Sequence, residues 1–408
     1  MTIGKTLLSV DEARARILAA VGRERPSETI ALDEAAGRTL ARDLTALRTQ
    51  PPADMSAMDG YALRTQDLAR GLVKLRQIGT STAGHGFAGS VGPGETVRIF
   101  TGAPVPPGAD AVLVQENARV ENGLVEPLKE IDADRYIRPK GLDFSEGEIL
   151  LPAGTRLNAA GLALAAGMNH ARVVVTRRPR VAILATGDEL VRPGELIGPS
   201  QIVATNSYAV AALVETAGGE PRDLGIARDE MGALEQAIRR AREDGTELLV
   251  TLGGASVGDL DLVKPALAKQ GIELDFWKIA MRPGRPAFHG RIGPMIILGL
   301  PGNPAAVLVA GHVFLVPLVR ALCGDPNAAR ETREAAMLGC PLGPNDQRQD
   351  YLRATLEPRT DGPPIATPFE LQDSSLLRIF AQSQCLVIRP PQAPAAQAGD
   401  LCQILRTD

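Results

Sequence analysis

Four acidic residues stand where chemistry is expected, because each one lies between a predicted strand and a predicted helix. Asp188 and Glu189 follow the apolar run 181–185, and Asp229 and Asp259 each precede a helical pattern. Ligands of open α/β sheets bind outside the carboxyl ends of the strands, so these carboxylates could converge. Mg²⁺ takes one or two carboxylates together with phosphate oxygens and water. The alternative is structural, since Asp229 and Asp259 are also good helix N-caps without a metal.

A glycine-rich loop at residues 253–258 follows an apolar strand pattern and contains Gly253, Gly254 and Gly258. Such glycines let successive N–H groups turn inward, and the hydroxyl of Ser256 adds a donor, which suits a phosphate. The loop also matches the GxSxG elbow of serine hydrolases, with Ser256 as nucleophile. In an elbow the helix begins almost at the serine, whereas the natural cap here is Asp259. The phosphate loop is therefore favoured.

A second loop of this kind follows the apolar run 295–300. Pro301 and Gly302 form its turn, Asn303 can cap the next helix, and Pro304 stands at the first helical position, where its missing N–H is harmless. Alone it would be a structural turn. Together with the glycine-rich loop and the acids, it indicates one ligand site at the sheet edge.

Cationic side chains surround a Pro-Gly turn between these two loops. Lys278, Arg282 and Arg285 are the cations in question. Planar guanidinium groups match tetrahedral oxyanions well, so the turn could clamp an oxyanion. A solvated basic turn is the structural alternative.

Three further motifs lie outside this region. Residues 55–62 contain Asp59-Gly60, which favours a tight hairpin, and residues 101–104 predict another turn. Residues 84–89 match the dinucleotide pattern GxGxxG, but the Gly- and Pro-containing residues that follow cannot begin the helix that a pyrophosphate requires. We interpret that pattern as a loop.

The elements that must position these residues change in type along the chain. A helix with Ser9 as N-cap is predicted at 9–21. Apolar runs separated by Gly and Pro predict an all-β insertion, with strands at 73–78, 95–100, 111–114 and 123–125. Strands then alternate with helices, which predicts βαβ units and a parallel sheet covered on both faces. Those strands are predicted at 181–185, 221–227, 247–252 and 295–300. A closing β domain is predicted from strands at 349–356, 384–388 and 401–405.

Composition restricts the partners. The 408 residues carry 44 Lys and Arg against 48 Asp and Glu, a net charge of −4 without a long basic run, so nucleic acid is not expected. The most apolar stretch, 295–322, is interrupted by Gly, Pro, Asn and His, which indicates a buried strand and helix and no membrane span. No export signal is visible, and four cysteines without CxxC spacing predict free thiols in the cytoplasm and no zinc site.

Seven motifs occur in the order found in the molybdopterin molybdenumtransferases, the MoeA/gephyrin E-domain family, which the chain resembles. They are SAMDGYA at 56–62, FTGAPVPPGADAVL at 100–113, RPKGLDF at 138–144, ATGDEL at 185–190, GGASVGDLD at 253–261, RPGRP at 282–286 and GLPGNPAA at 299–306. The tail sequence DSSLLRIFAQSQCLVI at 373–388 is also similar to the family's last domain.

The resemblance implies a multidomain α/β protein that forms an elongated homodimer with the active site between subunits. Four subdomains are expected: an N-terminal helix and linking subdomain at 1–48 and 145–178, a β-rich insertion at 49–144, a MogA-like three-layer α/β domain that binds molybdopterin at 179–327, and a C-terminal β-barrel at 328–408. A MogA-type adenylyltransferase and molybdoenzyme maturation proteins are the implied partners.

The resemblance also implies the last step of molybdenum-cofactor synthesis. Adenylated molybdopterin is hydrolysed with Mg²⁺, AMP leaves, and molybdate is placed on the dithiolene. The implied catalytic acids are Asp59, Asp143, Glu189, Asp229 and Asp259, the last three as metal ligands. The implied pterin and nucleotide site comprises Thr101, Gly253, Gly254, Ser256, Gly258, Pro301, Gly302, Asn303 and Pro304. The implied molybdate site comprises Arg282, Arg285, Arg348, Ser374 and Ser375. Asp59 and Thr101 would come from the partner subunit.

The chain departs from the family pattern at the implied oxyanion site. Arg282 and Arg285 occupy positions of which one or both usually hold Lys, and Ala306 lies where many members carry a hydroxyl. These changes leave the preference between molybdate and tungstate open. Two other functions remain as alternatives: a non-catalytic molybdopterin-binding scaffold of the same family, against which the retained acids argue, and a serine hydrolase that uses Ser256.

Overall fold

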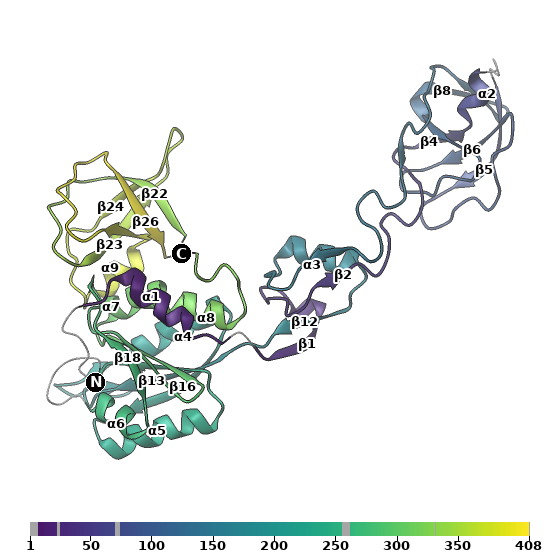
Figure 1. Ribbon diagram of the computed structural model, residues 1–408. Helices are drawn as coiled ribbons and strands as arrows, with labels where there is room; N and C mark the ends of the chain where they lie inside the picture. Colours follow the sequence, from purple (N-terminus) through teal and green to yellow (C-terminus); the bar gives the residue numbers. More distant parts are fainter. Residues whose placement is uncertain (1–6, 23–24, 70–73, 255–261, 331, 408) are drawn as a thin grey trace.

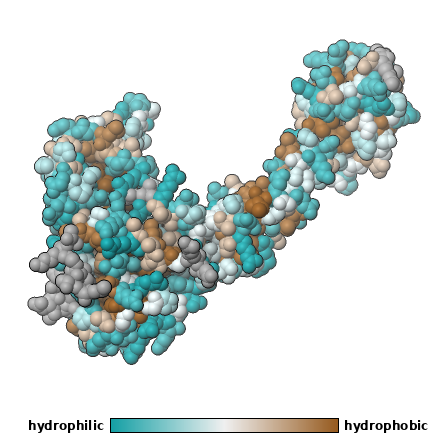
Figure 2. Space-filling model, in the orientation of Figure 1, coloured by the Kyte–Doolittle hydropathy of each residue, from teal (hydrophilic) through white to brown (hydrophobic). Residues whose placement is uncertain are grey.

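The computed structural model describes residues 7–22, 25–69, 74–254, 262–330 and 332–407. A compact body carries a long arm (Figure 1). We call residues 25–178 the arm; its outer part, residues 49–144, is the head, and the remainder is the linking unit. The body combines an α/β unit, a β-barrel stacked on it and the N-terminal helix α1 (Val10–Ala19). Figure 2 shows a mainly hydrophilic surface with apolar patches along the arm.

The α/β unit is built on a six-stranded sheet in the order β16-β13-β17-β21-β20-β18. The strands are β13 (Arg180–Thr186), β16 (Glu220–Ala227), β17 (Leu248–Leu252), β18 (Glu273–Trp277), β20 (Phe288–Ile292) and β21 (Met295–Leu300). The first four in the sheet are parallel, which confirms the four predicted strands. The last two pair antiparallel, so the sheet is mixed and not purely parallel.

Helices cover both faces of this sheet because alternate residues of each strand point to opposite sides. Val181 and Ile183 of β13 pack with α1, α4, α7 and α8, whereas Ala182 and Leu184 pack with α5 and α6. The helices are α4 (Asn206–Ala217), α5 (Met231–Glu243), α6 (Val263–Lys269), α7 (Pro304–Ala310), the π-helical turn η3 (Gly311–Leu315) and α8 (Val316–Leu322). Two short parallel strands, β14 (Leu190–Val191) and β15 (Ile202–Val203), lie beside the sheet.

Helix caps agree with the sequence in part. Ser9 caps α1 as predicted, its Oγ accepting from the N–H of Glu12 at 3.2 Å. The prediction that Asp229 caps α5 is wrong, because Glu230 occupies the N-cap. The N-cap of α4 is Thr205. Asp259, the third predicted cap, lies outside the described residues.

The longest apolar helical run is Pro304–Leu322, formed by α7, η3 and α8. It is the single candidate membrane span among the described residues, and 67% of it is buried inside the protein. It packs against α4 and α1 in the core of the α/β unit. This is the buried strand and helix that the sequence predicts for 295–322.

The linking unit has its own apolar core around Leu40, Leu157 and Val175. Its elements are β1 (Ser27–Ala31) paired with β12 (Arg172–Thr176), β2 (Leu44–Thr45) paired with β11 (Ile149–Leu151), the short 3₁₀ helix η1 (Leu32–Glu34) and α3 (Ala159–Gly167). Helix α1 does not join this core but packs on the body.

The head is a six-stranded sheet in the order β7-β4-β6-β5-β9-β8. Its strands are β4 (Gly60–Leu63), β5 (Leu75–Ser81), β6 (Glu95–Ile99), β7 (Ala111–Val114), β8 (Ala118–Glu121) and β9 (Leu124–Pro127). The short pair β3 (Met55–Ser56) and β10 (Ile137–Arg138) lies beside it, with the helical turns α2 (Thr65–Ala69) and η2 (Gln115–Asn117).

The predicted hairpin at Asp59-Gly60 is wrong. Gly60 begins the inner strand β4, which pairs with β6 and β7 and not with β3. A Cβ at Gly60 would lie 1.9 Å from the carbonyl oxygen of Leu113, so only glycine permits this close approach. The residue that suggests a turn therefore serves strand packing.

The C-terminal unit is a closed five-stranded barrel, as predicted. Its strands are β22 (Arg333–Leu338), β23 (Gln349–Glu357), β24 (Ile365–Pro368), β25 (Cys385–Arg389) and β26 (Leu401–Arg406), and pairing of β23 with β25 closes the ring. Helix α9 (Leu377–Gln382) packs against α7. One further strand, β19 (Met281–Arg282), comes from the α/β unit and pairs with β23, which ties the two units together.

Candidate functional site

A cleft of about 720 Å³ lies between the α/β unit and the barrel, at the carboxyl ends of β13, β17 and β21. Many of the predicted site residues line it: Glu189, Asp229, Gly253, Gly254, Arg282, Arg285, Pro301, Gly302, Asn303, Arg348 and Ser374. Pro304 begins α7 directly behind it. Ser256, Gly258 and Asp259 lie outside the described residues.

One side of the cleft is acidic. Glu189 and Asp229 line it, and the N–H of Asp229 donates to Asp188 Oδ1 at 3.2 Å. Burial, and next the negative charge of Asp188, raise the pKa of Asp229. Neighbouring carboxylates repel one another when ionised, and a cation bound between them would remove this repulsion. Within the described ranges, no group of three His, Cys, Asp or Glu forms a ready metal cage.

The two backbone loops meet at the floor of the cleft. Gly253 has φ +89°, and a Cβ there would lie 3.1 Å from the carbonyl oxygen of Thr186. Gly302 lies against Gly253, and its carbonyl accepts from Asn206 Nδ2 at 2.7 Å. The absence of side chains on both glycines leaves the backbone open to a close anionic ligand.

Asn303 occupies the N-cap of α7 as predicted, but its side chain makes no capping bond. Its Nδ2 instead donates to Ser374 Oγ in the barrel at 2.7 Å. Ser375, predicted beside Ser374, donates its hydroxyl to Asp373 at 2.6 Å. Ser374 is therefore the serine of this pair that lines the cleft.

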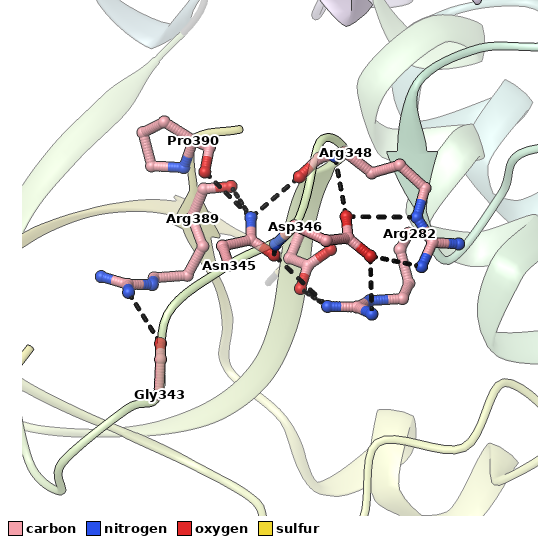
Figure 3. A network of polar contacts seen from close by, with 8 residues as sticks. Arg282, Gly343, Asn345, Asp346, Arg348, Arg389 and Pro390 are labelled. Carbon is pink, nitrogen blue, oxygen red and sulfur yellow. Dashed lines mark hydrogen bonds and ion pairs between the residues drawn. The ribbon is translucent and has the colours of Figure 1, made fainter. Parts of the chain in front are cut away.

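Arginines also line the cleft, and Figure 3 shows two of them, Arg282 and Arg348. Arg348 binds Asp346 through Nη2 at 2.7 Å and Nε at 3.3 Å. Arg282 contacts the same carboxylate at 3.4 Å and forms a closer ion pair with Asp350. Arg285 lines the cleft without a carboxylate partner among the residues that the structure describes.

Asp346 and Asp350 were not predicted as part of the site. The arginine pair lowers the pKa of Asp346 to about 2, chiefly through the hydrogen bonds from Arg348, whereas burial raises the pKa of Asp350. The sequence alternates Asp-x-Arg-x-Asp at 346–350, and across the bend at 347–348 the N–H of Arg348 donates to Asp346 Oδ1 at 2.8 Å. That alternation was the sequence signal for this pair.

Three predicted site residues lie far from the cleft, in the head. Asp59 Oδ1 accepts hydrogen bonds from the N–H of Thr101 at 2.7 Å and from its hydroxyl at 2.8 Å. These two bonds lower the pKa of Asp59. Asp143 lines a second hollow of about 460 Å³ with Gly102 and Arg138. Within one chain the structure does not bring these residues to the cleft.

Comparison with protein families agrees with these units. Three family models match in succession: "MoeA N-terminal region (domain I and II)" over residues 8–168, "Probable molybdopterin binding domain" over 182–321, and "MoeA C-terminal region (domain IV)" over 335–406. The second model covers the α/β unit that supplies the acids and both glycine loops.

Individual relatives extend over nearly the whole chain. A molybdopterin molybdenumtransferase of Haemophilus influenzae is 33% identical over 399 residues, 98% of each chain, and one of Bacillus subtilis is 32% identical over 98% of this chain and 94% of its own. One of Nostoc sp. is 41% identical over 74% and 70%. A crystal structure of the molybdopterin biosynthesis MoeA protein from Pyrococcus horikoshii OT3 covers 98% and 99% with a TM-score of 0.84 at 25% identity. The chain therefore belongs to the molybdopterin molybdenumtransferase family, a family of transferases.

Proposed function

We propose that this protein inserts molybdenum into molybdopterin, using adenylated molybdopterin and molybdate as substrates and releasing AMP. The observation that carries the proposal is that one cleft is lined both by the carboxylates Glu189 and Asp229 and by the guanidinium groups of Arg285 and Arg348. Cleavage of a pyrophosphate with the help of a cation needs carboxylates, and binding of an oxyanion needs arginines. The proposed reaction requires both in one cleft. The family relationship supports the same chemistry.

The acidic side fits Mg²⁺. Glu189 and Asp229 are hard oxygen donors. Burial, and next the charge of Asp188, raise the pKa of Asp229, and a bound cation would favour its ionised form. Asp259 is proposed as a third ligand on the sequence alone. When bound, the metal neutralises charge on the pyrophosphate and on the leaving AMP.

The glycine loops are proposed to hold the phosphate and the pterin. Backbone N–H groups near Gly253, Gly254 and Gly302 can approach an anion because no side chain intervenes. Ser256, Gly258, Pro301, Asn303 and Pro304 complete the proposed loop site. Arg282, Arg285, Arg348 and Ser374, with Ser375 beside them, are proposed to place molybdate near the dithiolene, where fixed geometry lowers the barrier.

A homodimer is part of the proposal. Asp59 and Thr101 lie together in the head with Asp143 near them, and the long arm could carry them to the cleft of a partner subunit. A MogA-type adenylyltransferase is proposed to supply the adenylate, and molybdoenzyme maturation proteins to receive the product. Within the described residues no disulfide joins the cysteines, which is compatible with the proposed cytoplasmic location.

The direct test is AMP release from adenylated molybdopterin by the purified protein with Mg²⁺, with molybdate and tungstate compared in parallel. We expect release that requires both Mg²⁺ and the oxyanion, and loss of release in Asp229→Asn. Tight binding of the adenylate without AMP release would contradict the proposal and favour a scaffold function. Labelling of Ser256 by a fluorophosphonate would instead favour a hydrolase.

A further inference from the structure

Four charged side chains and one amide form a network at the cleft (Figure 3). Arg282 comes from β19 of the α/β unit, whereas Asp346, Arg348 and Asp350 belong to the barrel. Asn345 Oδ1 accepts from Arg282 Nη2 at 3.3 Å and from the N–H of Asp346 at 2.9 Å. The network therefore holds both guanidinium groups in place, and both arginines line the cleft.

The two carboxylates of this network differ in their surroundings. The side chain of Asp350 is only 5% exposed and forms an ion pair with Arg282, next to which it lies in the β19–β23 pairing. The side chain of Asp346 is 43% exposed and is shared by both arginines. Asp350 is thus the structural partner of Arg282, and Asp346 is the carboxylate whose charge acts on both arginines together.

The charges in the network cancel, since two arginines face two carboxylates. The guanidinium nitrogens that have no acceptor in the described part of the chain are Arg348 Nη1 and Arg282 Nε. An oxyanion in the cleft meets well-held donors whose positive charge is already largely balanced. Arg285 is the cleft arginine that no described carboxylate balances.

We propose that Asp346 is a counter-ion that sets the affinity of the cleft for its oxyanion, and that it keeps this affinity low. The inference rests on the proposed function, in which the oxyanion is a substrate. A substrate held too tightly before the reaction gains nothing in rate, because only interactions that strengthen in the transition state accelerate the chemical step. Asp346 orders the arginine donors and at the same time limits the affinity of the cleft for the oxyanion.

The inference predicts an unusual direction of effect. Asp346→Asn keeps the size of the side chain and removes one negative charge near a divalent oxyanion. At a separation of about 6 Å in a water-like medium, the dissociation constant should fall about tenfold, which corresponds to about 1.4 kcal/mol. The gain should shrink as ionic strength rises, because exposed charges are screened.

The experiment measures molybdate and tungstate binding to the full-length protein by calorimetry, at low and high salt. Asp361→Asn is the matched control, because Asp361 also accepts from an arginine two residues away, Arg359, at 2.9 Å on the barrel surface. Asp346→Glu retains the charge and should stay within about twofold of the wild type. In steady state, Asp346→Asn should lower KM for molybdate without raising kcat.

Each outcome has a defined meaning. Tighter binding in Asp346→Asn alone, reduced by salt, supports the inference. Weaker binding in Asp346→Asn would show that the carboxylate acts only by holding Arg348, and this would overturn it. Arg285→Ala and Arg348→Ala distinguish a failure of the proposed oxyanion site from a failure of the counter-ion role of Asp346. If neither weakens binding, the proposed oxyanion site fails, whereas weakening there without a gain in Asp346→Asn removes only the counter-ion role.

Discussion

Asn303 at the start of α7 donates its side-chain N–H to Ser374 Oγ at 2.7 Å, which joins the α/β unit to the barrel across the cleft. The N–H of Ala305 donates to the carbonyl of Ser374 at 3.0 Å and adds a second bond to the same residue. Ser374 is thus held at the N-terminal end of a helix, where anions are favoured.

The first prediction concerns this contact. Ser374→Ala removes the acceptor of Asn303 and one cleft hydroxyl, so KM for molybdate should rise about five- to tenfold, as expected for one hydrogen bond. Ser375→Ala is the comparison, because its hydroxyl binds Asp373 and does not line the cleft. Kinetics on both variants give the answer. A larger effect from Ser375→Ala would assign the oxyanion to the other serine.

The second prediction concerns Asp229 and Mg²⁺. A raised folded-state pKa means that ionisation of Asp229 opposes folding, so this contribution to stability is lost as pH rises through that pKa. Asp229→Asn should therefore unfold at an equal or slightly higher temperature at neutral pH, while AMP release falls at least about 100-fold. Mg²⁺ should raise the melting temperature of the wild type and not of the variant. Equal stabilisation of both by Mg²⁺ would remove Asp229 from the metal site.

The third prediction concerns pH and stability. Burial lowers the pKa of His312, in the π-helical turn beside Phe380, to about 4. The imidazole of His312 is protonated near pH 6.5 in the unfolded chain and only near pH 4 in the folded chain. The free energy of unfolding should therefore fall by up to about 3 kcal/mol as the pH is lowered from 6.5 to 4. His312→Gln should flatten this dependence in denaturant titrations, whereas His85→Gln, on the exposed surface of the head, should not. Parallel curves for all three proteins would argue against His312 as the cause.

The fourth prediction concerns the shared active site. Asp59→Asn in the head and Arg348→Ala at the cleft should each lower activity at least about tenfold. In a mixed dimer carrying one variant in each subunit, one of the two sites has both residues intact. Co-expression with two affinity tags should therefore yield heterodimers with up to about half of the wild-type activity. Purified heterodimers without any recovery would show that Asp59 acts within its own subunit.

The parts of the fold that follow from local pattern were predictable. Apolar strand patterns that alternate with helical patterns identified the α/β unit. They are recognisable because a strand buried on both faces is a continuous apolar run and a covering helix has apolar residues on one face. The position of β4 did not follow, since the role of Gly60 depends on Leu113, more than fifty residues away. Local chemistry at Asp59-Gly60 favours a turn, and packing between strands overrides it.

The candidate site shows the same limit. The glycine loops and the acids at strand ends were visible because strand order brings such positions together. The pairing of Arg282 with Asp346 and Asp350 was not, because it joins segments 64 and 68 residues apart that only the β19–β23 contact aligns. Asp229 was assigned partly to a cap because an acid before a helix suits both roles, and only the backbone at Glu230 distinguishes them.

The arm leaves and rejoins the body at one place, since Ser27 of β1 is paired with Thr176 of β12 while α1, which precedes it, stays packed on the body. The two ends of the arm lie next to each other, so the arm can be exchanged as a unit. Replacing it by a short turn would keep the fold of the body and its cleft, because neither the sheet nor the barrel draws a strand from residues 25–178. Arms exchanged between relatives could then transfer the residues of the head without altering the units that line the cleft.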